Sequence, residues 1–155
     1  MTDKQELLDK INTAFKGVTL DGGTGLLKAC DLEHRGRLET EIRDRIQEAK
    51  DWREISAENA NQCYGSLSFM DVKGTRFHLP VFMTYDIKGD MDYDVLGTIA
   101  MQILTPGVAE SLTNEQRESV VEYINYMLNY DSFNDVYEEC CLPAIEKLQE
   151  FIREK

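Results

Sequence analysis

The chain has 155 residues, with 17 basic and 29 acidic side chains and a formal net charge of −12 at pH 7. Hydrophobic residues make up 42% of it, which excludes a disordered chain, and no run reaches the roughly 18 apolar residues that a membrane span needs. This length is typical of one domain, so we expect a single globular domain over 1–155. No apolar run follows Met1, and we therefore expect no secretory signal and a cytoplasmic protein.

The acidic residues are concentrated in the second half of the chain. Residues 1–85 carry 12 basic and 14 acidic side chains, a net charge of −2, whereas residues 86–155 carry five basic and 15 acidic side chains, a net charge of −10. Such a field repels nucleic acids and anionic membranes and attracts a basic protein. The charge therefore predicts a basic protein partner, with no nucleic acid and no membrane, and leaves the oligomeric state open.

Apolar residues recur at the spacing of amphipathic helices along most of the chain. The expected helices cover residues 3–16, 26–51, a short stretch from 56, 80–87, 95–104, 114–129 and 132–152. Two capping-box pairs mark helix starts, Thr2 with Gln5 and Thr113 with Gln116. We expect Ser132 to cap the last helix.

Glycines and prolines mark the expected interruptions of these helices. The run 17–25 contains four glycines, which favour a loop because they accept positive φ angles that other residues avoid. Gly36 is expected to bend or split the second helix, and Pro143 to kink or divide the last one. Pro80 fits the first turn of a helix that ends at Gly89.

One segment has the spacing of β-structure. Leu67 and Phe69 alternate with serines, and the run 71–74 has turn chemistry before the extended pattern of 75–79. We therefore expect a β-hairpin here. The expected fold class is mainly α, a single-domain helical bundle with one small β-hairpin (α+β).

Two loops match ligand-binding motifs only in part. The glycine-rich run has the outline of a P-loop, but Gly23 stands where the motif needs lysine, and a helix precedes it where the motif needs a strand. A structural turn is therefore preferred, and the helix N-terminus behind Gly25 stays open to an anion. Three aspartates alternate over 90–94 as in a calcium loop, but Val95 replaces the glycine of that motif, which favours a solvated acidic loop.

The four cysteines form no complete metal or catalytic motif. Cys30 and His34 are four residues apart and would share a helix face, as two zinc ligands do, but a closed zinc site needs four ligands and no CxxC spacing occurs. A nucleophilic cysteine–histidine pair stays open in principle. We expect buried thiols at Cys30, Cys63, Cys140 and Cys141, and no cofactor or metal.

The expected hairpin offers one candidate polar site. Arg76 and His78 fall on one face of its second strand, and Asp71 lies at the turn. Three ionisable groups so placed are able to orient a substrate or to act as acid and base. An ordinary solvated or ion-paired strand face is the alternative, and it is the preferred interpretation.

Tyrosines alternate with acidic residues in the C-terminal half, as on surfaces that bind basic proteins. The candidate partner-binding residues are Glu118, Glu122, Tyr123, Tyr126, Tyr130, Asp135, Tyr137 and Glu138. Plain amphipathic packing, with tyrosines at the core boundary and acids in water, explains the same pattern. Both interpretations stay open.

Four segments resemble a bacterial family known as a domain of unknown function. They are FKGVTLDGGTGL at 15–26, Asp51-Trp52, FMDVKGTRFHLP at 69–80 and, more loosely, LTNEQR at 112–117. The resemblance implies a bacterial source and a single helical domain, and it transfers no activity or catalytic residue. The last 25 residues or so lie outside it, which makes the acidic C-terminal helix a candidate feature of this protein alone.

Three functional hypotheses follow. The leading one is a small acidic cytoplasmic binding protein, an immunity-type inhibitor of a basic partner such as a bacterial toxin. The second is an enzyme of unrecognised class with its polar site at the 71–78 hairpin. The third is a structural or oligomeric helical module that shares the apolar face of 136–152 between identical subunits.

Overall fold

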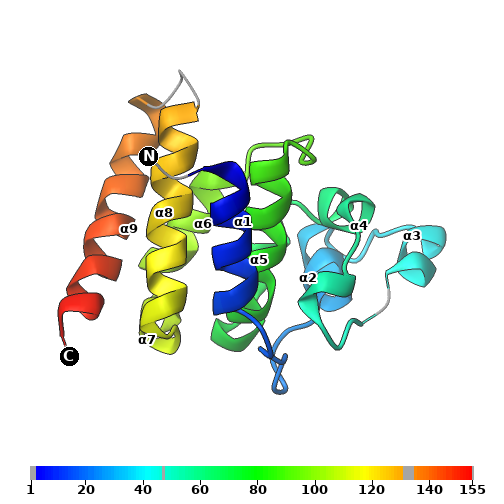
Figure 1. The fold of residues 1–155 in the computed structure, drawn as a ribbon. Coiled ribbons are helices and arrows are strands. Elements are labelled where there is room, and N and C mark those ends of the chain that lie inside the picture. Colours follow the sequence, from blue (N-terminus) through cyan, green and yellow to red (C-terminus); the bar gives the residue numbers. More distant parts are fainter. Residues whose placement is uncertain (1–2, 47, 131–134, 155) are drawn as a thin grey trace. The chain divides into compact units, whose positions relative to one another are not determined.

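The computed structural model describes residues 3–46, 48–130 and 135–154, and the side chains of 130 and 135–138 lie outside this description. Regular structure in the described residues is entirely helical, without a strand (Figure 1). The chain divides into two compact units, one formed by Met1–Lys16 with Leu96–Lys155 and one by Gly17–Val95. The expected single domain over 1–155 stays a prediction. None of the described helices has the length and apolar character to cross a membrane.

The first unit is built from helices distant in sequence. Its helices are α1 (Lys4–Ala14), α6 (Leu96–Leu104), α7 (Val108–Ser111), α8 (Asn114–Tyr130) and α9 (Asp135–Arg153). α8 packs between α1 and α9, and α6 packs against α9 (Figure 1). Leu7 and Ile11 of α1 are fully buried, as are Ile124 of α8 and Leu148 of α9, so the apolar stripes that predicted these helices form the core.

The ends of these helices follow the expected signals in most places. The capping box of α8 is confirmed, because the Gln116 backbone N–H donates to the Thr113 hydroxyl at 3.1 Å and the Thr113 N–H donates to the Gln116 amide oxygen at 3.0 Å. Pro143 lies inside α9 and does not divide it. The N-cap of α1 is Asp3, and the expected caps Thr2 and Ser132 lie outside the described residues.

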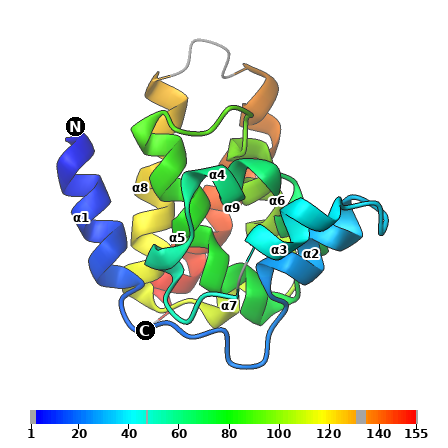
Figure 2. The same cartoon turned by 90° about the vertical axis from the view of Figure 1, so that its right-hand side faces the viewer.

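The second unit contains shorter helices joined by loops. They are α2 (Leu26–Glu33), α3 (Thr40–Arg45), the 3₁₀-helix η1 (Trp52–Glu54), α4 (Ala57–Gln62), the 3₁₀-helix η2 (Ser66–Phe69) and α5 (Val72–Lys88). The expected split at Gly36 is confirmed, since Arg35 and Gly36 take φ angles of 55° and 75° between α2 and α3 (Figure 2). The expected helix over 26–51 is wrong beyond Arg45, where α3 ends. Ser56 caps α4 as expected.

The predicted β-hairpin is wrong. Its first strand is η2, and its turn and second strand form the start of α5. Aspartate followed by glycine three residues later suits a turn, but here Asp71 is the N-cap of α5, and its carboxylate accepts a hydrogen bond from the Gly74 N–H at 2.8 Å. The fold class of the described residues is therefore all-α.

The second half of α5 matches the expected helix over 80–87, but its first half was predicted as β-structure because it has no polar stripe. Phe77, Leu79, Val81 and Phe82 are all buried, although they point in different directions around the helix axis. A helix buried on every side loses the 3.6-residue spacing by which helices are recognised. Pro80 also lies inside this helix instead of in its first turn, while Gly89, with φ of 78°, ends it as expected.

Three of the segments that carry the family resemblance contribute contacts within the second unit, whereas 112–117 belongs to the first unit. The glycine-rich loop lies on the first turn of α5, where the Thr24 N–H donates to the Asp71 carboxylate at 3.0 Å and the Asp71 N–H donates to the Thr24 hydroxyl at 3.2 Å. Asp51 caps η1, and Trp52 is buried beside it. This confirms the structural interpretation of the glycine-rich loop.

Gly74 allows the close approach of this loop to α5. A Cβ atom at position 74 would lie 2.5 Å from the Thr24 carbonyl oxygen, which is backbone and cannot rotate away. We expect Gly74→Ala to lower the free energy of unfolding by about 1–3 kcal/mol, the usual cost of overpacking, as measured by urea denaturation. Lys73→Ala, which removes only an exposed contact with Asp21, is the control and should cost less than about 1 kcal/mol. Equal effects of the two substitutions would contradict the close-approach explanation.

Candidate functional site

An acidic groove of about 460 Å³ lies between α1 and α8. The two helices pack side by side (Figure 1). Acidic residues far apart in sequence therefore line the same groove. Its walls are formed by Glu6, Asp9, Lys10, Thr13 and Ala14 of α1 and by Glu115 and Glu118 of α8. The groove is therefore lined by four carboxylates and one ammonium group.

The single ammonium group of the groove is already paired. The Lys10 Nζ atom lies 2.7 Å from a Glu122 carboxylate oxygen, with both side chains about one-third exposed. This ion pair crosses from α1 to α8 and neutralises the lysine. No other basic side chain lines the groove. Its four carboxylates are therefore not neutralised by a lining residue, and the groove attracts positive charge.

The predicted partner-binding residues differ in their burial and in their contacts. Glu118 is exposed and lines the groove, Glu122 forms the ion pair with Lys10, and Tyr126 is half-buried. Tyr123 is fully buried, so its ring belongs to the core and offers no surface to a partner. The side chains of Tyr130, Asp135, Tyr137 and Glu138 lie outside the described residues.

Sequence reasoning missed the half of the groove that α1 supplies. Glu6 and Asp9 belong to the half of the chain whose net charge is only −2, so a count of charge along the sequence could not reveal them. Their spacing on the polar face of a well-predicted helix was the only available signal.

The polar residues of the expected hairpin do not share a solvated strand face. Asp71 is the cap of α5, Arg76 is half-buried within that helix, and His78 is 1% exposed. Burial raises the pKa of the Asp71 carboxyl, but hydrogen bonds from Thr24 and Gly74 and the charge of Lys73 outweigh it and hold the pKa below its ordinary value. These contacts give Asp71 a structural role.

The environment of His78 favours its neutral form. One ring nitrogen, Nδ1, lies 2.7 Å from the Gly74 carbonyl oxygen of the preceding turn, to which the neutral ring donates. Burial lowers the pKa of His78 to about 4, and the hydrogen bond to Gly74 opposes this only in part. Neither the acidic groove nor the pocket in the second unit described below is lined by Asp71, Arg76 or His78.

The helix N-terminus behind Gly25 is occupied by the chain itself. The Leu27 N–H, in the first turn of α2, donates to a Glu48 carboxylate oxygen at 3.3 Å. A Cβ atom at position 25 would lie 2.0 Å from the same carboxylate, so glycine is needed for this contact. Glu48 thus takes the place of an external anion.

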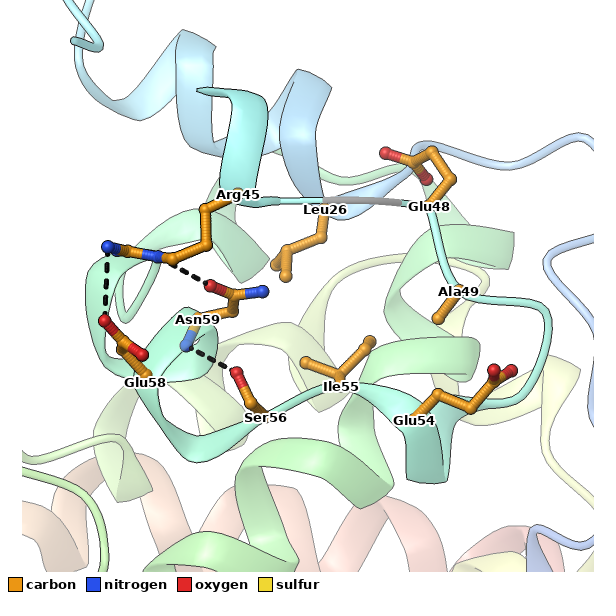
Figure 3. A pocket seen from close by; sticks show the side chains of 9 residues that line it. All are labelled: Leu26, Arg45, Glu48, Ala49, Glu54, Ile55, Ser56, Glu58 and Asn59. Carbon is orange, nitrogen blue, oxygen red and sulfur yellow. Dashed lines mark hydrogen bonds and ion pairs between the residues drawn. The ribbon is translucent and has the colours of Figure 1, made fainter. Parts of the chain in front are cut away.

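A pocket of about 350 Å³ opens beside this contact, in the second unit (Figure 3). Leu26 and Ile55 form its apolar floor, and Arg45 stands at one side, where it pairs with Glu58 at 3.1 Å and donates to the Asn59 amide oxygen at 3.3 Å. Its main polar groups are therefore engaged by neighbouring side chains. This pocket supports no specific ligand.

A cluster of cysteine, histidine and glutamate lies at the end of α2. Cys30 is joined to Cys63, at the C-terminal end of α4, by a disulfide with Cα atoms 5.1 Å apart. Ligand atoms of Cys30, Glu33 and His34 lie within 4.8 Å of one another. The expectation of four buried thiols is wrong for Cys30 and Cys63, which form the disulfide. Outside the disulfide, Cys141 is buried as expected, whereas Cys140 is only half-buried.

The apolar face of α9 is covered within the chain. Ile145 and Leu148 are buried, and α9 packs against α6 and α8. The oligomeric-module hypothesis required this face to be shared between subunits. Of its described residues, Cys141, Ile145 and Leu148 are buried in the first unit, whereas Cys140 and Ile152 are half-buried.

The chain belongs to a family of unknown function, DUF6714, whose family model matches residues 3–154. This confirms the expected uncharacterised family. The match includes α9, so the expectation that the C-terminal helix lies outside the family is wrong. Comparison with curated proteins and with solved structures gave no match.

Proposed function

We propose that the protein binds a basic segment of another protein in the groove between α1 and α8. The observation that carries this proposal is the charge of the groove, where four carboxylates face one space and Lys10 is paired with Glu122. A lysine or arginine that enters the groove is attracted by several carboxylates at once, whereas an anion is repelled.

The whole chain supports such binding through its net charge of −12. A field of this sign steers a basic protein toward the groove and is able to raise the association rate by 10 to about 1,000-fold at low salt. The groove volume of about 460 Å³ falls within the range of roughly 300–1,000 Å³ that is common for ligand sites. It suits a few basic side chains of one segment.

The finer form of the proposal is an immunity-type inhibitor in the bacterial cytoplasm. A toxin that acts on an anionic substrate such as nucleic acid needs a basic surface. An acidic protein that covers this surface competes directly with the substrate. The acidic groove and the excess of negative charge fit this role.

A labelled peptide with lysine and arginine along one helix face tests the groove directly. We expect Glu115→Lys with Glu118→Lys to weaken its binding about tenfold or more, because two attractive charges become repulsive inside the groove. Fluorescence anisotropy at low and at high salt measures the affinity. Binding of the peptide to the unchanged protein should fall steeply with salt.

The matched control reverses two exposed carboxylates of α9, Glu146→Lys with Glu150→Lys. Both double variants change the net charge by +4, so they alter the overall electrostatic field equally. They differ only in where the substituted residues lie. We expect the control to weaken peptide binding by no more than about threefold. Equal losses in the two variants would contradict binding in the groove, because they would show attraction by net charge alone.

A further inference from the structure

Three potential zinc ligands, Cys30, Glu33 and His34, meet where α2 ends, in the unit that does not contain the acidic groove, and the disulfide attaches a fourth, Cys63, to the first of them. Cys30 and Glu33 belong to α2, His34 is its C-cap, and Cys63 is the C-cap of α4. The disulfide brings the two sulfur atoms together, and Glu33 and His34 lie within 4.8 Å of Cys30 and of each other. Two thiolates, one imidazole and one carboxylate are a complete tetrahedral donor set for zinc.

The histidine is at the distance that shared metal binding requires. The Cys30 Sγ and His34 Nδ1 atoms are 3.8 Å apart. Zinc–sulfur and zinc–nitrogen bonds of about 2.3 and 2.0 Å at a tetrahedral angle separate the two donors by about 3.6 Å. His34 Nδ1 now donates to the Cys30 carbonyl oxygen at 2.8 Å, so metal binding exchanges this hydrogen bond for a coordinate bond and leaves the ring proton on Nε2.

Glu33 supplies a second observation that points to cation binding at this cluster. One carboxylate oxygen accepts a hydrogen bond from the Gly65 N–H at 3.1 Å, which orients the side chain. The other oxygen is buried and has no hydrogen-bond partner among the described residues. A buried acceptor in this state is stabilised by a metal ion.

Gly65 is required for this orientation of Glu33. A Cβ atom at position 65 would lie 2.6 Å from the Glu33 carboxylate. Two nearby residues therefore contact the end of α2, Cys63 through the disulfide and Gly65 through its backbone N–H. Hydrogen bonds of this kind, from backbone to ligand, are typical of zinc sites.

We propose that Cys30, Cys63, His34 and Glu33 bind one zinc ion when the cysteines are reduced, and that formation of the disulfide releases it. Thiolates favour zinc over magnesium or calcium, and the mixed sulfur, nitrogen and oxygen set favours tetrahedral zinc. The disulfide and the metal exclude each other, because both use the same two sulfur atoms. The site adds to the proposed binding function and does not depend on it.

The chemistry balances with ordinary cellular reagents. Two small thiols reduce the disulfide to two protein thiols and leave as their own disulfide. Zinc binding then displaces two protons from the protein thiols. In the reverse direction, hydrogen peroxide and two protons oxidise the two thiolates to the disulfide, yield two water molecules and free the zinc ion.

Titration of the full chain with Co²⁺ and Zn²⁺ tests this site. The protein is reduced with a phosphine, desalted without oxygen and compared with the oxidised form. We expect the reduced protein to bind one equivalent of Co²⁺ with thiolate-to-cobalt charge-transfer absorbance and tetrahedral ligand-field bands, both lost on addition of one equivalent of Zn²⁺. The oxidised protein should show neither absorbance. Absence of charge-transfer absorbance in the reduced protein would overturn the proposal.

Single substitutions assign the ligands. We expect Cys63→Ser and His34→Ala to weaken zinc binding by about 100-fold or more, and Glu33→Gln by about 10- to 100-fold. The control Cys141→Ser replaces a buried cysteine outside the cluster and should change the affinity less than about threefold. Unchanged affinity in Cys63→Ser would overturn the proposal. Circular dichroism of each variant detects any loss of folding, and the comparison of oxidised with reduced wild-type protein needs no variant.

Discussion

Reduction of the Cys30–Cys63 disulfide in metal-free protein should lower the free energy of unfolding by about 4 kcal/mol. The two cysteines are 33 residues apart in sequence, and a cross-link over such a loop removes conformational entropy from the unfolded chain to about this extent. Urea denaturation of the oxidised and reduced protein measures the change. A loss this large is a substantial fraction of the 5–15 kcal/mol that is typical of a folded domain.

The double variant Cys30→Ser with Cys63→Ser separates the disulfide from other effects of the reductant. We expect it to be about as unstable as the reduced wild-type protein and to be unaffected by reductant. Cys140 and Cys141 remain in this variant, so any effect of reductant through them would appear there. A difference of less than about 1 kcal/mol between oxidised and reduced wild-type protein would contradict a stabilising role for the disulfide.

His78 should make the protein sensitive to acid. Burial lowers the pKa of His78 to about 4 in the folded protein, whereas the pKa is near 6.5 in the unfolded chain. Between these two pH values the unfolded chain binds a proton at His78 and the folded protein does not. The contribution of His78 to stability is therefore complete above pH 6.5 and decreases as the pH falls toward 4. The difference of about 2.5 pKa units corresponds to about 3 kcal/mol.

The variant His78→Gln removes this titration and retains an amide donor for the Gly74 carbonyl. Between pH 6.5 and pH 4, we expect the free energy of unfolding of the wild-type protein to fall by about 3 kcal/mol more than that of the variant. The raised pKa of Glu33 acts in the opposite direction within this interval and is common to both proteins. Asp71, whose pKa is lowered, acts at lower pH. Parallel pH profiles would contradict the buried neutral state of His78.

The amphipathic helices of the first unit were predictable because each buries only one face. In α8 the apolar stripe, the capping box and the charged face agree with one another, and the observed helix differs from the prediction by a single residue at its end. In α5 only the second half was predicted as a helix, over 80–87, because burial of Phe77, Leu79 and Val81 on different sides removed the helical spacing of the first half. Pro80 and Gly74 then added misleading signals of a break and a turn.

The candidate sites were predictable only where their residues lie on one element. The spacing of Cys30 and His34 placed two potential ligands on one helix face, but Cys63 comes from a different helix, and nothing in its local sequence indicates the pairing. Likewise Glu118 was predicted at a partner surface, whereas Glu6 joins it only because α1 packs against α8. Tertiary packing of this kind lies beyond periodicity and motif spacing.

The most direct test of the proposed function is photo-cross-linking from inside the groove. A photoreactive phenylalanine analogue replaces the exposed Thr13, which lines the groove, or in a second variant the exposed Gln149 of α9. We expect irradiation in host lysate at low salt to join Thr13 variants to one basic protein through a lysine- or arginine-rich segment, and high salt to abolish the adduct. The same adducts from both positions, or adducts from the groove that include no basic protein, would contradict the proposal.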